Sequence, residues 1–348
     1  MQNTKALIRW LDATVAAVAV AVVVGGITRL TESGLSIVEW KPISGALPPL
    51  TATDWAQAYT AFLQIPQAQT IHAGITLDAF KTLFWWEWVH RLVARGVGLV
   101  IALPYVWFWI KKQIPSTLSG RLFALPLLVL AQGALGWYMV SSGLAVRTNV
   151  SQYRLVAHLG LALVILVVAL WTSATLRAQR RRAVGNADAA PAASPAWRRF
   201  TEAFAVWTFG VILSGGFVAG LRAGKIYNTF PLMGGQVVPP GYWGLDSFIQ
   251  NAFENPAAAQ FHHRVLAILT VCAAIAAWFV ASLRDVPPRV RLAQRNVAIA
   301  AGVQVTLGIG TLLMKVPVYM AALHQISAVV LLSTAVLAAH AAADRKGA

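Results

Sequence analysis

The chain has 348 residues, of which 58% are apolar and only 11% are charged, and 14 are tryptophan. Soluble domains carry about 25% charged residues, so this composition, with a mean hydropathy of +0.64, excludes soluble enzymes, secreted disulfide scaffolds and disordered chains. The single cysteine, Cys272, excludes an intramolecular disulfide and a cysteine-based metal site. The chain, with a formal net charge of +16, is therefore predicted to be an integral membrane protein. Because it lacks cysteine-based redox groups, any redox chemistry requires a bound cofactor.

Eight apolar segments are long enough to cross a bilayer, since a helical span needs about 20 mainly apolar residues. We therefore predict an all-α integral membrane protein with eight transmembrane helices. A polar, Pro-containing stretch at 177–198 predicts a linker between an N-terminal half, 1–176, and a C-terminal half, 199–348. The predicted spans are 12–30, 84–110, 121–141, 154–176, 200–220, 260–282, 292–313 and 319–341.

The basic residues predict the orientation of these spans. With the N-terminus inside, 17 of the 28 Lys and Arg residues fall in inner segments and 8 in outer segments, as the positive-inside bias requires. Both termini are then cytoplasmic, and the positive charge needs no nucleic acid partner. About ten residues precede the first span, too few for a transit peptide, so we expect a cell inner membrane. The long loops at 31–83 and 221–259 fall outside and are expected to fold as caps.

The two halves resemble each other in sequence. His90 precedes Gln132 by 42 residues, and His263 precedes Gln304 by 41. Because each half has an even number of predicted helices, the repeat is parallel, and we expect two parallel four-helix-bundle repeats. The matched positions are Gly25-Gly26 with Gly215-Gly216, His90-Arg91 with His263-Arg264, Gln132-x-x-Leu135-Gly136 with Gln304-x-x-Leu307-Gly308, and His158 with His324.

Each even-numbered helix carries a histidine near its outer start that has a counterpart in the other half: His90, His158, His263 and His324. Ionisable residues are rare in spans and usually face the bundle interior. Two imidazoles from facing helices suit axial ligation of a haem iron better than a tetrahedral zinc, which needs four ligands. The competing interpretation of each histidine is an interhelical hydrogen bond. Small residues would open space for a flat macrocycle: Gly96, Gly98, Gly133, Gly136, Gly160, Gly302, Gly308 and Gly310.

The halves differ one helical turn before the first histidine of each pair. Glu87 lies three residues before His90, on the same helix face, whereas Gln260 stands before His263. A carboxyl group beside one metal centre indicates that the first half performs chemistry while the second stores or passes electrons. The competing interpretation is that Glu87 is an interfacial carboxylate paired with Arg91 or Lys81.

Other candidate residues carry weaker signals. His72, in the first outer loop, is a candidate for a proton shuttle or a ligand contact, although a solvated loop histidine is the simpler interpretation. Arg91 and Arg264 follow the histidines and could reach outward toward haem propionates. His262 is interpreted as a helix-interface residue and Cys272 as a small buried hydrophobe.

These motifs together resemble the haem A synthase family over nearly the whole chain. The resemblance lies in the run GGITRLTESGLS at 25–36, the segments EWKP at 39–42 and GALPP at 45–49, the motif Glu87-x-x-His90-Arg91, and the run FHHR at 261–264. It implies an oxidoreductase that oxidises a porphyrin methyl group of haem O to a formyl group, giving haem A for cytochrome c oxidase. It further implies that His263 and His324 hold a resident haem B. His90 and His158 would be the axial ligands of the substrate haem, with Glu87 as the catalytic acid.

One departure from the family pattern indicates which branch of the family the chain resembles. Some bacterial members carry a cysteine pair in the outer loops, and this chain has none there, so it resembles the cysteine-free branch of proteobacteria and mitochondria. The residues leave open the electron donor, which is a ferredoxin-like protein or a quinol. They also leave open contact with the haem O-producing farnesyltransferase and the formation of a homo-oligomer, while membrane lipid is an expected partner.

Two other classes of protein share some of these features. A bis-histidine membrane cytochrome that transfers electrons from quinol through two haems would use the same four histidines without needing the asymmetry at Glu87. A transporter would also have parallel repeats with ionisable groups in its spans. The outer placement of all four histidines argues against the transporter.

Overall fold

The computed structural model describes residues 2–144, 149–185 and 192–343. Residues 186–191 of the predicted linker lie outside these ranges, as do Arg147, Arg345 and Lys346, which contribute to the predicted orientation. Within the described residues, eight helices are long and apolar enough to cross a membrane, one at each predicted place. They are α1 (Gln2–Leu30), α4 (Leu77–Ile110), α5 (Ser119–Leu144), α6 (Gln152–Ala183), α7 (Pro195–Gly220), α9 (Pro256–Leu283), α10 (Pro288–Leu313) and α11 (Val318–Ala343).

Several of these helices extend past the predicted spans. Helix α1 begins at Gln2 rather than at 12, and α4 begins at Leu77 rather than at 84. Hydropathy marks only the apolar stretch, whereas helical hydrogen bonding continues until a capping residue ends it. Thr76 caps α4 by accepting a hydrogen bond from Ala79 N, and Asn255 caps α9 immediately before Pro256.

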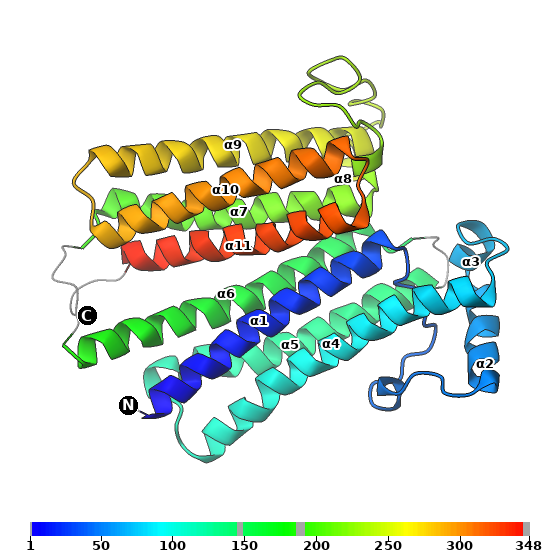
Figure 1. Cartoon of the computed structure of the whole chain (residues 1–348), viewed down its shortest axis with the longest axis horizontal. Coiled ribbons are helices and arrows are strands. Elements are labelled where there is room, and N and C mark those ends of the chain that lie inside the picture. Colours follow the sequence, from blue (N-terminus) through cyan, green and yellow to red (C-terminus); the bar gives the residue numbers. More distant parts are fainter. Residues whose placement is uncertain (1, 145–148, 186–191, 344–348) are drawn as a thin grey trace.

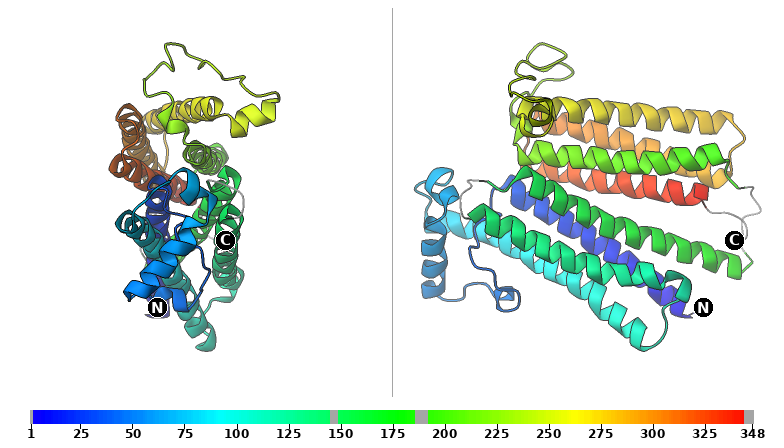
Figure 2. Two further views of the ribbon diagram at one scale, coloured as in Figure 1. Left: turned by 90° about the vertical axis from the view of Figure 1, so that its right-hand side faces the viewer. Right: turned by 180° about the vertical axis from the view of Figure 1, so that it is seen from behind.

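The eight long helices form two groups of four, seen as the lower and upper groups in Figure 1 and from behind in Figure 2. In the first group, α1 and α5 each contact both α4 and α6, which closes a ring. In the second group, α7 and α10 each contact both α9 and α11. In both rings the first and third helices, counted along the chain, contact the second and fourth. This shared pattern is compatible with two parallel four-helix repeats.

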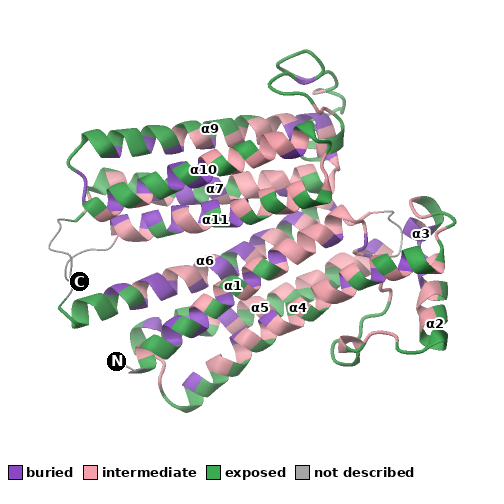
Figure 3. Ribbon diagram, in the orientation of Figure 1, coloured by how far each residue is buried: buried purple, intermediate pink, exposed green. Residues whose placement is uncertain are grey.

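The two groups meet along α6 and α11, which contact each other, while α7 packs on α6 and α1 on α11. These central helices are the most buried spans, with 44% and 56% of their apolar windows buried (Figure 3). At one end of the junction, Glu32 and Arg222 form an ion pair at 3.0 Å. The two residues lie at equivalent positions after α1 and α7, and both have left-handed backbone, with φ of 59° and 54°. Arg29 also crosses the junction, donating to Gly220 O at 3.0 Å.

The bundle has two distinct ends (Figure 1). We call the end where α1 begins and α11 finishes the terminus end, and the opposite one the loop end. Loop 1 (31–76) and loop 2 (221–255) both lie at the loop end, and they are shorter than predicted because α4 and α9 begin earlier.

Loop 1 is a folded cap, as predicted. It contains η1 (Ser44–Ala46), α2 (Ala52–Leu63) and α3 (Pro66–Thr70), and it has its own apolar core around Leu35 and Phe62. Helix α2 starts with a capping box, in which hydrogen bonds from Thr51 lower the pKa of Asp54. Loop 2 contains η3 (Ala223–Lys225) and α8 (Phe248–Glu254), and a further short helix, η2 (Ser116–Leu118), precedes α5 at the terminus end.

Candidate functional site

The structure brings the four predicted histidines together as two pairs. They lie on the second and fourth helices of each ring, His90 on α4 with His158 on α6, and His263 on α9 with His324 on α11. Within each pair the side chains are close enough for their charges to interact. The rings of His263 and His324 have centroids 6.5 Å apart and planes at 83°. Each pair therefore spans the interior of its ring of helices.

Each imidazole packs against a glycine on the neighbouring helix, at a distance that excludes a side chain there. A Cβ atom at Gly25 of α1 would lie 2.8 Å from His90 Cε1, and one at Gly215 of α7 would lie 3.0 Å from His263 Cε1. The fourth helices repeat the arrangement, with Gly136 against His158 and Gly308 against His324. The repeat predicted these glycines as matched positions, and contact with the imidazole rings is what the four have in common.

The nitrogen atoms of the histidines are satisfied differently in the two halves. Ser214 directs its own proton to Val211 O at 2.7 Å and therefore accepts the Nδ1 proton of His263 at 2.8 Å. Such a bond orients the ring and leaves the other nitrogen for a metal. In the first half Val24 stands at the position of Ser214, and the buried Nδ1 of His90 has no hydrogen-bond partner. Sequence reasoning missed Ser214, although it directly precedes a matched glycine.

The glutamines of the repeat also contact the histidines. Gln132 Nε2 lies 3.3 Å from His158 Nε2, and Gln304 Nε2 lies 3.4 Å from His324 Nε2. The Nδ1 atoms of these two histidines are buried without a partner. Both halves thus present an imidazole pair with unsatisfied ring nitrogens in the bundle interior.

The residues fit a haem held by two axial histidines. Two metal–nitrogen bonds of about 2 Å, with the radii of the rings, place bis-imidazole centroids about 6 Å apart, close to the value for His263 and His324. Among the residues that the structure describes, no three His, Cys, Asp or Glu side chains gather as a metal-ligand cluster. Nothing lies within 4 Å of a Cβ atom built at four of the glycines expected to make room, namely Gly96, Gly98, Gly133 and Gly302.

The other glycines predicted to make room have different roles. Gly160 of α6 packs against Leu213 of α7, where the two rings approach closely. Gly310 of α10 packs against Met320 of α11, where two helices of one ring approach closely. Gly136 and Gly308 contact histidine rings, as described above.

Glu87 is buried, with only 2% of its side chain exposed, and it contacts Arg91 on its own helix and two residues of loop 1. Its Oε1 accepts hydrogen bonds from Arg91 Nη2 at 2.6 Å and Nε at 3.0 Å. Its Oε2 accepts from Ser36 Oγ and Ile37 N, both at 2.8 Å. The ion pair with Arg91 is thus present, whereas Lys81 pairs with Asp78 instead.

The two predicted propionate arginines have the same loop contacts. Arg91 donates to Ile37 O and Glu39 O, and Arg264 donates to Tyr227 O and Thr229 O, all between 2.7 and 2.9 Å. Ile37 and Tyr227 are at equivalent positions, twelve residues after the glycines that contact the histidines. Each arginine therefore fastens its loop to the second helix of its half.

The remainder of this outer network differs between the halves. Gln260 donates to Tyr227 O at 3.1 Å and gives the guanidinium no carboxylate, so Arg264 Nε is buried without a partner. In the first half the corresponding nitrogen of Arg91 donates to Glu87.

Three weaker candidates are placed as follows. His72 lies in loop 1 with its ring centroid 6.2 Å from that of Phe62, and its Nε2 is buried without a partner, so this nitrogen is not solvated. His262 lies 2.7 Å from the hydroxyl of Tyr242 and thus contacts loop 2 rather than a neighbouring span. Cys272 is exposed on α9, contrary to the prediction that it is buried, because that side of the helix has no neighbour in the bundle.

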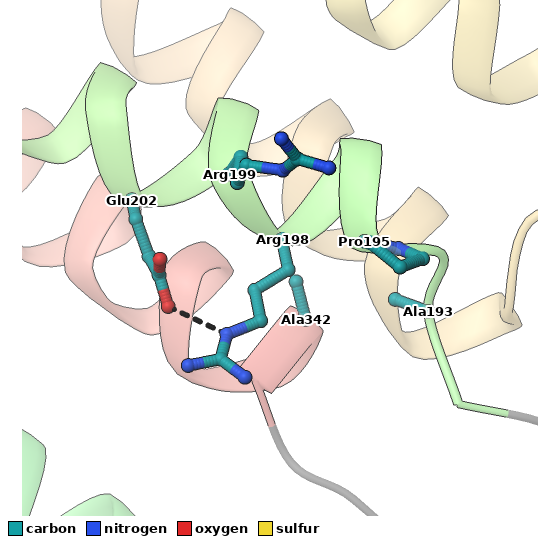
Figure 4. Close-up of a pocket in the computed structure, with 6 residues that line it drawn as sticks. All are labelled: Ala193, Pro195, Arg198, Arg199, Glu202 and Ala342. Atoms are coloured by element: carbon teal, nitrogen blue, oxygen red, sulfur yellow. Dashed lines mark hydrogen bonds and ion pairs between the residues drawn. The ribbon is translucent and has the colours of Figure 1, made fainter.

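A separate cavity lies at the terminus end, between the start of α7 and the end of α11 (Figure 4). Arg198 and Glu202 in its wall form an ion pair at 2.9 Å. Its lining contains no histidine, so it is not a candidate haem site. The lining residues are Ala193, Pro195, Arg198, Arg199, Glu202 and Ala342.

The fold and the four histidines define a class, a multi-pass helical membrane protein with an interior histidine pair in each of two similar helix rings. Comparison with known proteins identifies the family. The family model COX15-CtaA, described as cytochrome oxidase assembly protein, matches residues 8–336. The chain belongs to this family, whose named relatives are enzymes.

Curated relatives match over nearly their full lengths. A "Heme A synthase" of Nitrosospira multiformis is 41% identical over 331 residues, covering 95% of this chain and 92% of the relative. Proteins of the same name from Rhizobium etli and Maricaulis maris are 44% and 43% identical, covering 96% and 97% of this chain and 89% and 96% of the relatives.

Proposed function

We propose that this protein is a haem A synthase, which oxidises a ring methyl group of haem O to a formyl group and so supplies haem A for cytochrome c oxidase assembly. The proposal draws on the family relationship and above all on one observation. The two histidine pairs are similar but differ one helical turn before their first histidine, where the first half has the buried carboxylate of Glu87 and the second half has Gln260. A protein that only transferred electrons would not need this difference.

In this proposal the first half, 1–176, holds the substrate. His90 and His158 bind the iron of haem O as axial ligands, and haem A leaves from the same place. The unpartnered Nδ1 of His90 suits a ligand that must bind and release an exchangeable haem, because no hydrogen bond fixes its ring.

The second half, 199–348, holds a resident haem B between His263 and His324. The bond from His263 to Ser214 supports this assignment, since an oriented imidazole binds a metal more tightly. When bound, haem B supplies electron transfer. The residues of this half orient it and keep water from it.

Glu87 is the catalytic residue of the first half in this proposal. Its carboxylate is fixed on the face of α4 that bears His90, one turn nearer the loop end. Oxidation of a methyl carbon releases protons and develops positive charge, and a fixed carboxylate stabilises that charge and accepts a proton at Oε1 or Oε2. Arg91 and Ser36 hold Glu87 in place by the bonds described above. The role of Arg91 and Arg264 is first to fasten the loops, with propionate contact as a further task for Arg264, which lacks a carboxylate partner.

The membrane arrangement follows the distribution of basic residues. We propose that the terminus end faces the cytoplasm and that the loop end, with both histidine pairs near it, faces outward across a cell inner membrane. The partners proposed from the family resemblance are the haem O-producing farnesyltransferase and a ferredoxin-like or quinol electron donor. His72 remains a candidate contact between loop 1 and the substrate.

The test is to purify the protein in detergent from cells that make haem O, extract the pigment with acid acetone, and resolve the haems by chromatography with mass detection. We expect haem B together with haem O, haem A or a hydroxylated intermediate. Haem B alone would contradict the proposal and favour a two-haem cytochrome, and a protein without haem would contradict both.

A further inference from the structure

Arg154 lies close to the first histidine pair, and none of the roles described above explains its position. It lies on α6 four residues before His158, and therefore on the same helix face one turn nearer the loop end. Its guanidinium lies 4.6 Å from the ring centroid of Tyr138 on α5. It donates hydrogen bonds to the Tyr138 hydroxyl at 3.3 Å and to Ser142 Oγ. The side chain is thus held in a defined position between α5 and α6.

All these contacts of Arg154 are with neutral groups. Within the described ranges 2–144, 149–185 and 192–343, no carboxylate forms an ion pair with it, whereas Arg91 in the same half is paired with Glu87. Arg154 is half-buried at the start of α6, where a counter-charge would stabilise its guanidinium. Its position therefore favours an anionic ligand in the space beside His158.

The second half has no such charge at the equivalent position. Four residues before His324 stands Met320, whose Cε packs against Gly310. There the arginine without a carboxylate partner is Arg264, on the second helix of the ring. The fourth helix of the first half thus carries a guanidinium without a carboxylate partner among the described residues, Arg154, at the position where the fourth helix of the second half has the neutral Met320.

We propose that Arg154 binds a propionate carboxylate of the haem held by His90 and His158, and that this contact sets the rotation of the substrate in its site. This inference rests on the proposed function. Propionates are the anionic groups of a haem, and a guanidinium binds a carboxylate through two parallel hydrogen bonds. The methyl group that becomes the formyl group shares a pyrrole ring with a propionate. Fixing that propionate therefore fixes the position of the reacting methyl, which makes Arg154 a positioning residue.

The experiment measures binding rather than turnover. Purified protein, with the haem that it retains, is titrated with iron protoporphyrin IX and with its dimethyl ester, and the added Soret absorbance is followed. We expect the wild type to bind the free acid about 10- to 100-fold more tightly than the ester, as for a hydrogen bond between charged groups. In Arg154→Met, which carries the residue of the second half, this preference should fall to about 3-fold or less. Arg154→Lys should keep part of it, because lysine binds as a point charge.

Two controls separate the failure of this inference from the failure of the proposed function. Arg95→Met removes an α4 arginine that also lacks a carboxylate partner in the described part of the chain but donates to the loop 1 carbonyls of Lys41 and Pro42, and it should keep the full preference. His158→Ala should lose the titratable binding of both probes. An unchanged preference in Arg154→Met, or no preference in the wild type, would overturn the propionate contact while the loss in His158→Ala upholds the haem site. Unchanged binding in His158→Ala would overturn both. The spectrum of the resident haem reports whether each variant is folded, and Arg154→Gln repeats the test if the methionine variant is not.

Discussion

The first and second halves of the molecule use one framework for two kinds of site. In both, an arginine that follows a histidine fastens a loop by two carbonyl groups, and a glycine on the preceding span receives the imidazole ring. The differences are single side chains around this framework, with Glu87 for Gln260, Val24 for Ser214 and Arg154 for Met320. The first half is charged where the second is neutral, and the second has an imidazole oriented by a hydrogen bond, that of His263, where the first does not. In the proposed function, two similar helix rings thus differ in task through single substitutions around a common packing.

The largest expected effect separates the two haem sites. His90→Ala should remove haem O and haem A from the purified protein and leave haem B, whereas His263→Ala should remove haem B. Loss of an axial ligand should weaken binding by at least about 100-fold, because even an outer contact to a metal ligand costs 10- to 100-fold. Pigment extraction with quantification of each haem measures both variants. If either variant lost both kinds of haem equally while remaining folded, the assignment of one haem to each half would be wrong.

The next effect concerns the carboxylate that only the first half has. Glu87→Gln should keep haem binding but lower the rate of haem A formation by about 10²- to 10⁴-fold, the usual contribution of a positioned acid or base. Extracted pigment should then consist of haem B with haem O or a hydroxylated intermediate. Gln260→Glu is the matched change in the second half and should leave the haem A yield nearly unchanged. A full yield of haem A from Glu87→Gln would contradict the catalytic role.

A third comparison uses glycines that contact a histidine and glycines that contact nothing. Gly308→Ala would place a methyl group 2.8 Å from His324 Cε1, so the imidazole ring must move. The affinity for haem B should then fall about 5- to 100-fold, as for overpacking of about 1–3 kcal/mol, and haem B occupancy should fall with it. Gly210→Ala on α7 meets no atom within 4 Å, at a position not expected to make room for haem, and should leave occupancy unchanged. Gly136→Ala and Gly120→Ala, both on α5, repeat the comparison in the first half, with haem O binding as the measurement. Equal behaviour within a pair would show that the contact with the histidine is unimportant.

The smallest effect tests the oriented ligand of the second half. Ser214→Ala removes the acceptor of the His263 Nδ1 proton and should weaken haem B binding by about 10-fold, measured by competition with an apo haem-binding protein. Val24→Ala, at the equivalent position of the first half, should change haem O binding less because Val24 has no hydrogen bond to lose. A larger effect of Val24→Ala than of Ser214→Ala would contradict the role of the Ser214 hydrogen bond in haem B binding.

The spans and the pairing of the four histidines could be predicted from the sequence, and the helix contacts are compatible with the predicted repeat. A span is a local property, since about 20 apolar residues suffice, and all eight predicted segments lie within helices. The ends of the helices were less predictable, because hydrogen bonding at Thr76 and Asn255, rather than hydropathy, sets where α4 and α9 begin.

Contacts between helices could be decided only by the tertiary structure. The sequence by itself determined that Glu87 lies one turn from His90 and that Gln260 replaces it, because these are spacings along one helix. It could not determine that Glu87 pairs with Arg91 rather than Lys81, that Ser214 orients His263, or that Arg154 has no carboxylate partner among the described residues. These facts depend on how each helix is rotated and how closely it approaches its neighbours. Packing across the whole bundle sets that geometry, and no pattern within one segment encodes it.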